Sequence, residues 1–85
     1  MTVELIEKFV EQTERKGKPV KIHFKTRNTI TGIFIETKDY GELKAKNFWR
    51  IVTQQHIPDW KKTGNINLAK IFSGSEFTKL TPDAN

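Results

Sequence analysis

The sequence contains no cysteine, which excludes disulfide bonds and cysteine-ligated zinc and fits a reducing compartment. Its only histidines, His23 and His56, lie far apart, and neither has the local spacing to a carboxylate that known metal motifs use. We therefore expect neither a metal nor another cofactor. A chain of 85 residues has room for one small hydrophobic core, so self-association is the reinforcement that remains.

Long apolar runs are also absent. No stretch approaches the roughly 18 apolar residues that span a membrane. Glu4, Glu7 and Lys8 interrupt the start of the chain, so it lacks the apolar segment of a signal peptide. We expect a protein without a membrane segment that resides in the cytoplasm.

Groups suited to catalysis are scarce. His23 alternates with apolar residues and is expected on the exposed side of a strand, while His56 lies beside Asp59 in a predicted loop. No phosphate-binding loop, dinucleotide-binding glycine pattern or zinc-hydrolase spacing is present. These absences argue against an enzyme.

Positive charge, by contrast, is plentiful. Fifteen Lys and Arg against ten Asp and Glu give a net charge of +5, and the acids concentrate near the N-terminus. This favours a polyanionic partner such as nucleic acid, although ordinary solubility charge explains it too. Single-stranded nucleic acid is bound by cations interleaved with aromatics, but the same cations also fit the solvated face of a sheet. The cations concerned are Lys21, Lys25, Arg27, Lys44, Lys46, Arg50, Lys61 and Lys62, and the aromatics are Tyr40, Phe48, Trp49 and Trp60.

Residues 2–16 carry apolar side chains at spacings of three and four, with acids near the start and bases near the end. This pattern predicts an amphipathic helix with Thr2 as its N-cap. Gly17 and Pro19 are expected to end it.

Beyond Pro19 the apolar period changes to two, which predicts β-strands. Gly32, inside the second strand, indicates a bulge, a bend or a close backbone approach. The strands are expected at residues 20–25, 30–36, 42–52, 66–72 and 76–80.

Residues 53–64 contain Pro58, Asp59 and Gly64 and are predicted to form a long loop. Trp60 lies within it. A tryptophan in such a polar segment either folds back onto the sheet or contacts a partner, and we favour the first.

A helix followed by closely spaced strands leaves no room for crossover helices. We therefore expect one mainly β domain over residues 1–85, in which an N-terminal helix lies on a strongly bent five-stranded antiparallel sheet or small open barrel. A closed, monomeric SH3-like barrel also fits.

Two segments carry a resemblance to a known family. Residues 20–39, VKIHFKTRNTITGIFIETKD, combine an apolar strand, a polar turn, the mid-strand Gly32 and an aspartate, and residues 71–80, IFSGSEFTKL, place Gly74, Phe77 and Leu80 in a second pattern. In this order and separation they resemble the two motifs of the Sm and LSm family of RNA-binding proteins. The resemblance implies an Sm-like fold, with the family's variable loop at residues 53–64.

The residues that hold RNA in family members are largely replaced. Either the turn holds one extra residue and Asp39 is the motif's aspartate, or Lys38 replaces that acid. The motif's asparagine corresponds to Leu43 or Glu42, and its arginine to Ser73. A preference for uridine-rich RNA is therefore not implied.

Tyr40 falls where family members often place a base-stacking side chain, although a tyrosine that caps a hairpin turn fits equally well. The candidate RNA-binding residues that the resemblance implies are Lys38, Asp39, Tyr40, Ser73, Gly74 and Ser75.

Family members also pair the fifth strand of one subunit with the fourth strand of the next, which covers both sheet edges and closes a ring. The resemblance thus implies a non-catalytic scaffold that forms a homo-oligomeric ring and binds single-stranded RNA. The alternative is a protein-interaction or assembly module with the same barrel that has lost nucleic-acid binding.

Overall fold

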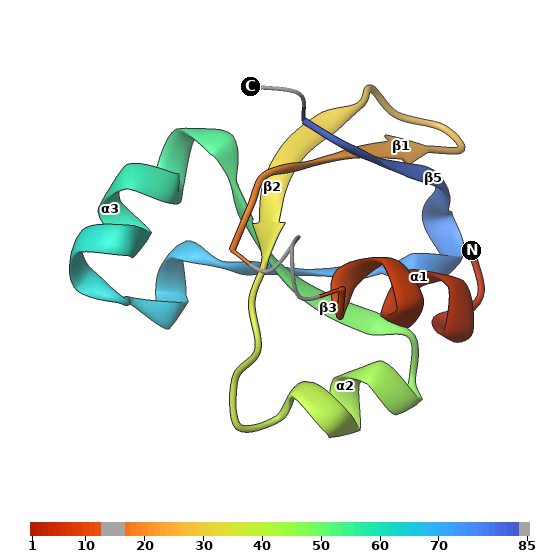
Figure 1. Ribbon diagram of the computed structural model, residues 1–85, viewed down its shortest axis with the longest axis horizontal. Coiled ribbons are helices and arrows are strands. Elements are labelled where there is room, and N and C mark those ends of the chain that lie inside the picture. Colours follow the sequence, from red (N-terminus) through yellow and green to blue (C-terminus); the bar gives the residue numbers. More distant parts are fainter. Residues whose placement is uncertain (13–16, 84–85) are drawn as a thin grey trace.

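The computed structural model describes residues 1–12 and 17–83 (Figure 1). Within these residues, the sheet contains five strands, and three short 3-10 turns accompany the helices and strands. In chain order, the helices and strands are α1 (Val3–Val10), β1 (Val20–Phe24), β2 (Ile30–Phe34), α2 (Tyr40–Ala45), β3 (Phe48–Thr53), α3 (Ile57–Thr63), β4 (Lys70–Ser73) and β5 (Phe77–Pro82).

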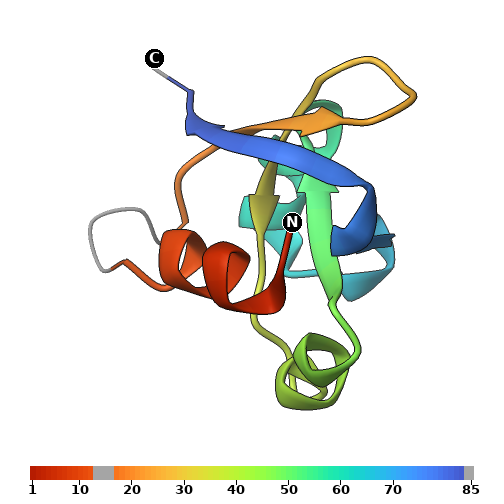
Figure 2. The same cartoon turned by 90° about the vertical axis from the view of Figure 1, so that its right-hand side faces the viewer.

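The strands form one antiparallel sheet in the order β4-β3-β2-β1-β5, which confirms the predicted N-terminal helix with a five-stranded antiparallel sheet. The sheet does not close on itself, because β4 and β5 remain at its two edges. Figure 2 shows its curvature: β5 (blue) runs across the directions of β2 (yellow) and β3 (green).

The N-terminal helix begins as predicted and ends earlier. The Thr2 hydroxyl accepts a hydrogen bond from the Leu5 amide at 3.3 Å, so Thr2 is the N-cap. The helix ends at Val10 with Glu11 as its C-cap, and the remainder of the predicted helix, residues 13–16, lies outside the described residues.

The predicted third strand, residues 42–52, is wrong in its first half. Residues 40–45 form α2, and β3 begins only at Phe48. Glu42 in the first turn and Lys44 in the last complement the helix dipole. Asn47 then takes a positive φ of 62°, which turns the chain from α2 into β3.

The predicted loop at residues 53–64 is also wrong, because most of it is α3. Pro58 lies in the first turn of this helix, where its missing amide hydrogen costs nothing. Gly64, at φ 68°, is the left-handed C-cap and donates its amide to the Trp60 carbonyl at 2.7 Å. The residues that suggested a loop are therefore the start and stop signals of a helix.

The last two strands are shifted relative to their predicted bounds. Residues 66–68 form a 3-10 turn, so β4 is confined to Lys70–Ser73. Residues 74–76 form a second 3-10 turn, and β5 then extends to Pro82. Thr81, which lies beyond the predicted end of the last strand, thus belongs to β5 and pairs with β1.

Two hydrophobic cores lie on opposite faces of the sheet. α1 covers the larger core, and α3 lies on the other side (Figures 1 and 2). Trp60 packs against the smaller core, which confirms that this side chain folds back. The buried residues are Ile6, Val10, Val20, Ile22, Trp49, Ile51, Phe77 and Leu80 in the larger core and Ile33, Ile35, Val52 and Ile57 in the smaller.

Gly32 marks a close approach of β2 to β3, one of the alternatives that its position in the sequence indicated. A Cβ atom built at Gly32 would lie 2.6 Å from Cγ2 of Ile51 and 2.8 Å from the carbonyl oxygen of Val52. Since neither neighbour is an end of a flexible exposed side chain, only glycine fits between the strands.

We expect Gly32→Ala to lower the free energy of unfolding by about 1–3 kcal/mol, because the added methyl overpacks the contact between β2 and β3. Gly41→Ala is the matched control. A Cβ at Gly41 meets no atom within 4 Å, and alanine in α2 should leave stability unchanged or raise it by up to about 1 kcal/mol. Urea unfolding followed by tryptophan fluorescence measures both. Equal effects of the two substitutions would contradict the close approach at Gly32.

Candidate functional site

Asp39, a candidate from the sequence, is held by Arg50. Its carboxylate accepts hydrogen bonds from Nε of Arg50 at 3.2 Å and from Nη2 at 2.6 Å, and it also accepts one from the Thr37 hydroxyl. The Arg50 hydrogen bonds, followed by the Thr37 bond, lower the pKa of Asp39 from the ordinary 3.8 to about 2. The forked ion pair fixes the start of α2 to β3, while Lys38 beside it is exposed.

Tyr40 is engaged within the fold. Its hydroxyl donates a hydrogen bond to Oε2 of Glu11 at 2.7 Å, and its ring meets Trp49 edge to face with centroids 6.0 Å apart. Nζ of Lys44 lies 5.3 Å from the centroid of the Tyr40 ring. Burial, and then the hydrogen bond to Glu11, raise the pKa of Tyr40 well above its usual range. Tyr40 therefore begins a helix and ties α2 to the end of α1, and it caps no hairpin turn.

The other candidate residues from the sequence, Ser73, Gly74 and Ser75, lie close to α1. Ser73 and Ser75 share a hydrogen bond at 2.7 Å between their hydroxyls. Gly74 is buried: its amide donates to the Asn47 carbonyl at 2.8 Å, and a Cβ at Gly74 would lie 2.6 Å from Cδ1 of Ile6.

Both groups of candidate residues are bonded to β3 or to the residue before it. Asp39 is bonded to Arg50 of β3, and Gly74 is bonded to Asn47, which precedes β3. A hollow of about 600 Å³ borders Lys38 and Asp39 but none of residues 73–75. The structure thus joins the predicted residues to one strand without gathering their side chains around one opening.

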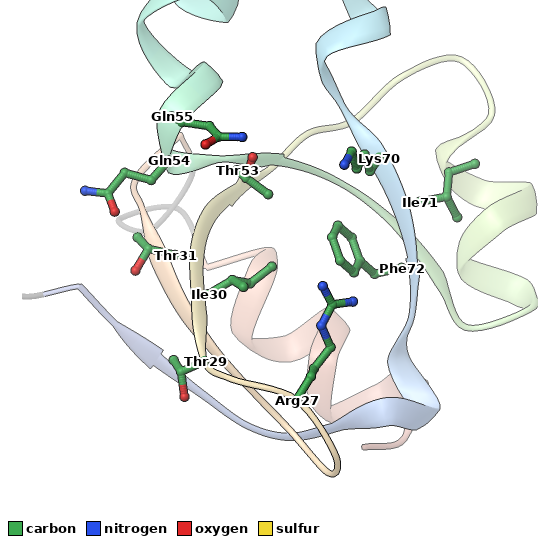
Figure 3. A pocket seen from close by; sticks show the side chains of 10 residues that line it. All are labelled: Arg27, Thr29, Ile30, Thr31, Thr53, Gln54, Gln55, Lys70, Ile71 and Phe72. Atoms are coloured by element: carbon green, nitrogen blue, oxygen red, sulfur yellow. The ribbon is translucent and has the colours of Figure 1, made fainter.

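A larger opening lies elsewhere, between the turn before β2, the end of β3 and the edge strand β4. It has a volume of about 800 Å³. In Figure 3 the side chains of Arg27, Ile30 and Phe72 point into the space that these strands enclose. We call this opening the basic groove, and its lining residues are Arg27, Thr29, Ile30, Thr31, Thr53, Gln54, Gln55, Lys70, Ile71 and Phe72.

The chemistry of the basic groove is that of an anion site with apolar walls. Arg27 and Lys70 supply positive charge, and none of the ten lining residues is an aspartate or a glutamate. The Arg27 guanidinium carbon lies 5.1 Å from the centroid of the Phe24 ring and 5.7 Å from that of Phe72, so the cation rests on two aromatic rings. Thr53 and the amide of Gln55 add donors and acceptors.

The sequence indicated only part of this groove. Arg27 stood among the cations interleaved with aromatics, but Lys70, Gln54, Gln55 and Phe72 were not singled out. The sequence does carry one indication of the groove: residues 53–55, TQQ, are polar and directly follow the buried residues of β3. It marks the point where that strand leaves the core.

Comparison of the chain with protein-family models, curated proteins and solved structures gave no match. The groove must therefore be interpreted from its own chemistry.

The described residues show no metal centre and no membrane-crossing helix. No group of three or more His, Cys, Asp or Glu side chains lies close enough together there to hold a metal ion. None of the helices in the described ranges is both long and apolar enough to cross a bilayer.

The Asp39–Arg50 pair predicts a specific acid response. Because the pKa of Asp39 is lower in the folded protein than its ordinary value, the pair stabilises the fold above about pH 4, and this contribution is lost as the pH falls from 3.8 to about 2. We expect Asp39→Asn to be less stable than the parent protein at pH 6. The difference should shrink across that interval in urea unfolding at a series of pH values.

Glu42→Gln, an exposed position on the same helix, is the control and should change stability much less at pH 6. A difference between the parent protein and Asp39→Asn that stays constant from pH 6 to pH 2 would show that the carboxylate is not stabilised by Arg50.

Proposed function

We propose that this protein is a non-catalytic RNA-binding scaffold with an Sm-like bent sheet, and that a single-stranded RNA segment binds in the basic groove. The observation that carries the proposal is the composition of the groove. It combines two cations, hydrogen-bonding side chains and an aromatic ring, and none of its ten lining residues is acidic.

The cations suit a phosphate. Arg27 is already held against Phe24 and Phe72, so less conformational entropy is lost when its planar fork meets phosphate oxygens. Lys70, on β4, supplies a second charge on a flexible stem. Because phosphate contacts release counterions, this part of the binding weakens with salt.

The apolar and amide groups suit a base. Phe72 and Ile30 offer apolar surface inside the groove, and Gln55 can bond the edge of an unpaired base. The volume of about 800 Å³ lies within the range of small-molecule sites, which is the size that a bound nucleotide requires. A single strand fits best, because a duplex hides the edges that this amide would bond.

A binding role is supported over catalysis by what the groove contains. None of its ten lining residues is a histidine, cysteine or carboxylic acid, the side chains that most often act as general acid or base.

The Sm-like part of the proposal is supported by the order of elements: an N-terminal helix precedes a bent, open antiparallel sheet with its fourth and fifth strands at the edges. α2 and α3 lie outside that pattern. Since Asp39 is paired with Arg50 and Tyr40 with Glu11, we assign the RNA contacts to the basic groove in place of the residues that the family resemblance implies.

We also propose that β4 of one copy pairs with β5 of the next, so that a homo-oligomeric ring forms. β4 and β5 each have one side without a neighbouring strand in the described sheet, and Ile71, on β4, is 49% exposed. Ile66, 42% exposed, lies close before β4 in the chain. These apolar side chains are also the observation that favours the alternative, a protein-interaction module without RNA.

Titration of short single-stranded RNA at two salt concentrations separates the two functions. We expect binding at low salt that weakens as salt rises. Arg27→Gln should reduce the salt slope by about 0.7, the value for one phosphate contact in a single strand. Phe72→Leu should weaken binding by about 1–3 kcal/mol if a base stacks on this ring.

Lys61→Gln, an exposed cation on α3, is the matched control and should leave affinity nearly unchanged. Failure of the parent protein to bind RNA at low salt would reject the RNA proposal and favour the interaction module.

The ring has its own measurement. Light scattering at micromolar concentration should give a multiple of the 9.9 kDa chain mass. Ile71→Lys should shift the particle towards the monomer with an unchanged circular dichroism spectrum, because a charge on the edge strand opposes pairing. A monomer mass for the parent protein would exclude the ring.

A further inference from the structure

The outer face of β1 is polar and basic. Val20 and Ile22 are buried on the inner face, so Lys21 and His23, between and after them, lie on the outer face. Lys21 is exposed and His23 is half-buried.

The neighbouring strands continue this polar face on both sides. Lys21 pairs with Thr31 on β2 and with Thr81 on β5, and His23 pairs with Lys79 on β5. Residues directly opposite each other in a sheet share a face. With Thr29, these residues define what we call the outer strip: Lys21, His23, Thr29, Thr31, Lys79 and Thr81.

Hydrogen bonds fix the middle of the outer strip. Nδ1 of His23 lies 3.2 Å from the Thr29 hydroxyl, and Nε2 lies 3.4 Å from the Thr81 hydroxyl, so the imidazole bridges the turn before β2 and strand β5. Lys21 and Lys79 are exposed beside it. None of the six residues is acidic. Asp83, two residues after Thr81, bounds the strip at its far end.

The outer strip is continuous with the basic groove. Thr29 and Thr31 belong to both, since they line the groove. Figure 3 shows their side chains directed away from the enclosed space, opposite to Arg27 and Ile30. A chain leaving the groove past these threonines therefore passes directly onto the outer face.

We propose that the sugar–phosphate backbone of a bound RNA strand continues from the basic groove over Thr29 and Thr31 onto the outer strip, where Lys21 and Lys79 contact phosphates. This inference rests on the proposed RNA binding in the groove and adds the path and length of the ligand. Two strand spacings separate β2 from β5, roughly 10 Å, so the strip lengthens the binding site beyond what the groove alone holds. The positive charge, together with hydroxyls and no acid in the strip, matches a phosphodiester chain.

Two RNA lengths separate the groove from the strip. The probes are a diribonucleotide and an unstructured dodecaribonucleotide of mixed sequence, each titrated at several salt concentrations. The double variant Lys21→Gln/Lys79→Gln should bind the dodecanucleotide several-fold more weakly at low salt, with a salt slope smaller by about 1.4 for two lost phosphate contacts. Its affinity for the dinucleotide should equal that of the parent protein.

Lys61→Gln/Lys62→Gln is the matched control, because it removes the same charge from the exposed face of α3. An equal loss of dodecanucleotide affinity in this control would show a general charge effect and overturn the strip. Unchanged dodecanucleotide binding in Lys21→Gln/Lys79→Gln, with Arg27→Gln still weakening both probes, would also overturn the strip and leave the groove standing. Failure of the parent protein to bind either probe would instead reject the proposed function itself.

Discussion

The close contact between β2 and β3 at Gly32 is the constraint on which the remaining structure depends. Because Gly32 has no side chain, Ile51 and the Val52 backbone can lie against β2. The two strands then bury both of their faces: Ile51 belongs to the core under α1, and Val52 to the core on the α3 side. Thr53, which pairs with Gly32, stands where β3 leaves the core and lines the basic groove. The contact at Gly32 therefore holds β2 against β3 and also places Thr53 in the candidate site.

The distribution of charge follows from how the acids are used. On the α1–α2 side of the described chain, ion pairs join Lys44 to Glu7 and Glu11, and Arg50 to Asp39. The hydrogen bond to Glu7 is the main cause of a raised pKa at Lys44, and that to Asp39 has the same effect at Arg50. These carboxylates hold the helices to one another and to β3. The groove has no acid among its ten lining residues, so Arg27 and Lys70 make its surface positive, as is the net charge of +5.

Local patterns predicted the parts of the fold that local forces decide. The N-cap at Thr2 and the alternation of β1 could be predicted from neighbouring residues, and for Gly32 the close approach was one of three alternatives. α3 was missed because Pro58 and Gly64 break a helix in its interior but favour its two ends. The site was missed because turn, strand end and edge strand come from three distant parts of the sequence, and only the curvature of the sheet brings them together.

We infer that ligand contacts lie in the basic groove and not at the residues implied by the family resemblance. Nuclear magnetic resonance tests it most directly, with the ¹⁵N-labelled protein titrated with single-stranded RNA at low salt. If RNA binds in the basic groove, the largest shifts of backbone amide signals fall at residues 27–31, 53–55 and 70–72. Shifts confined to residues 38–40 and 73–75, or a spectrum unchanged by RNA, would contradict it.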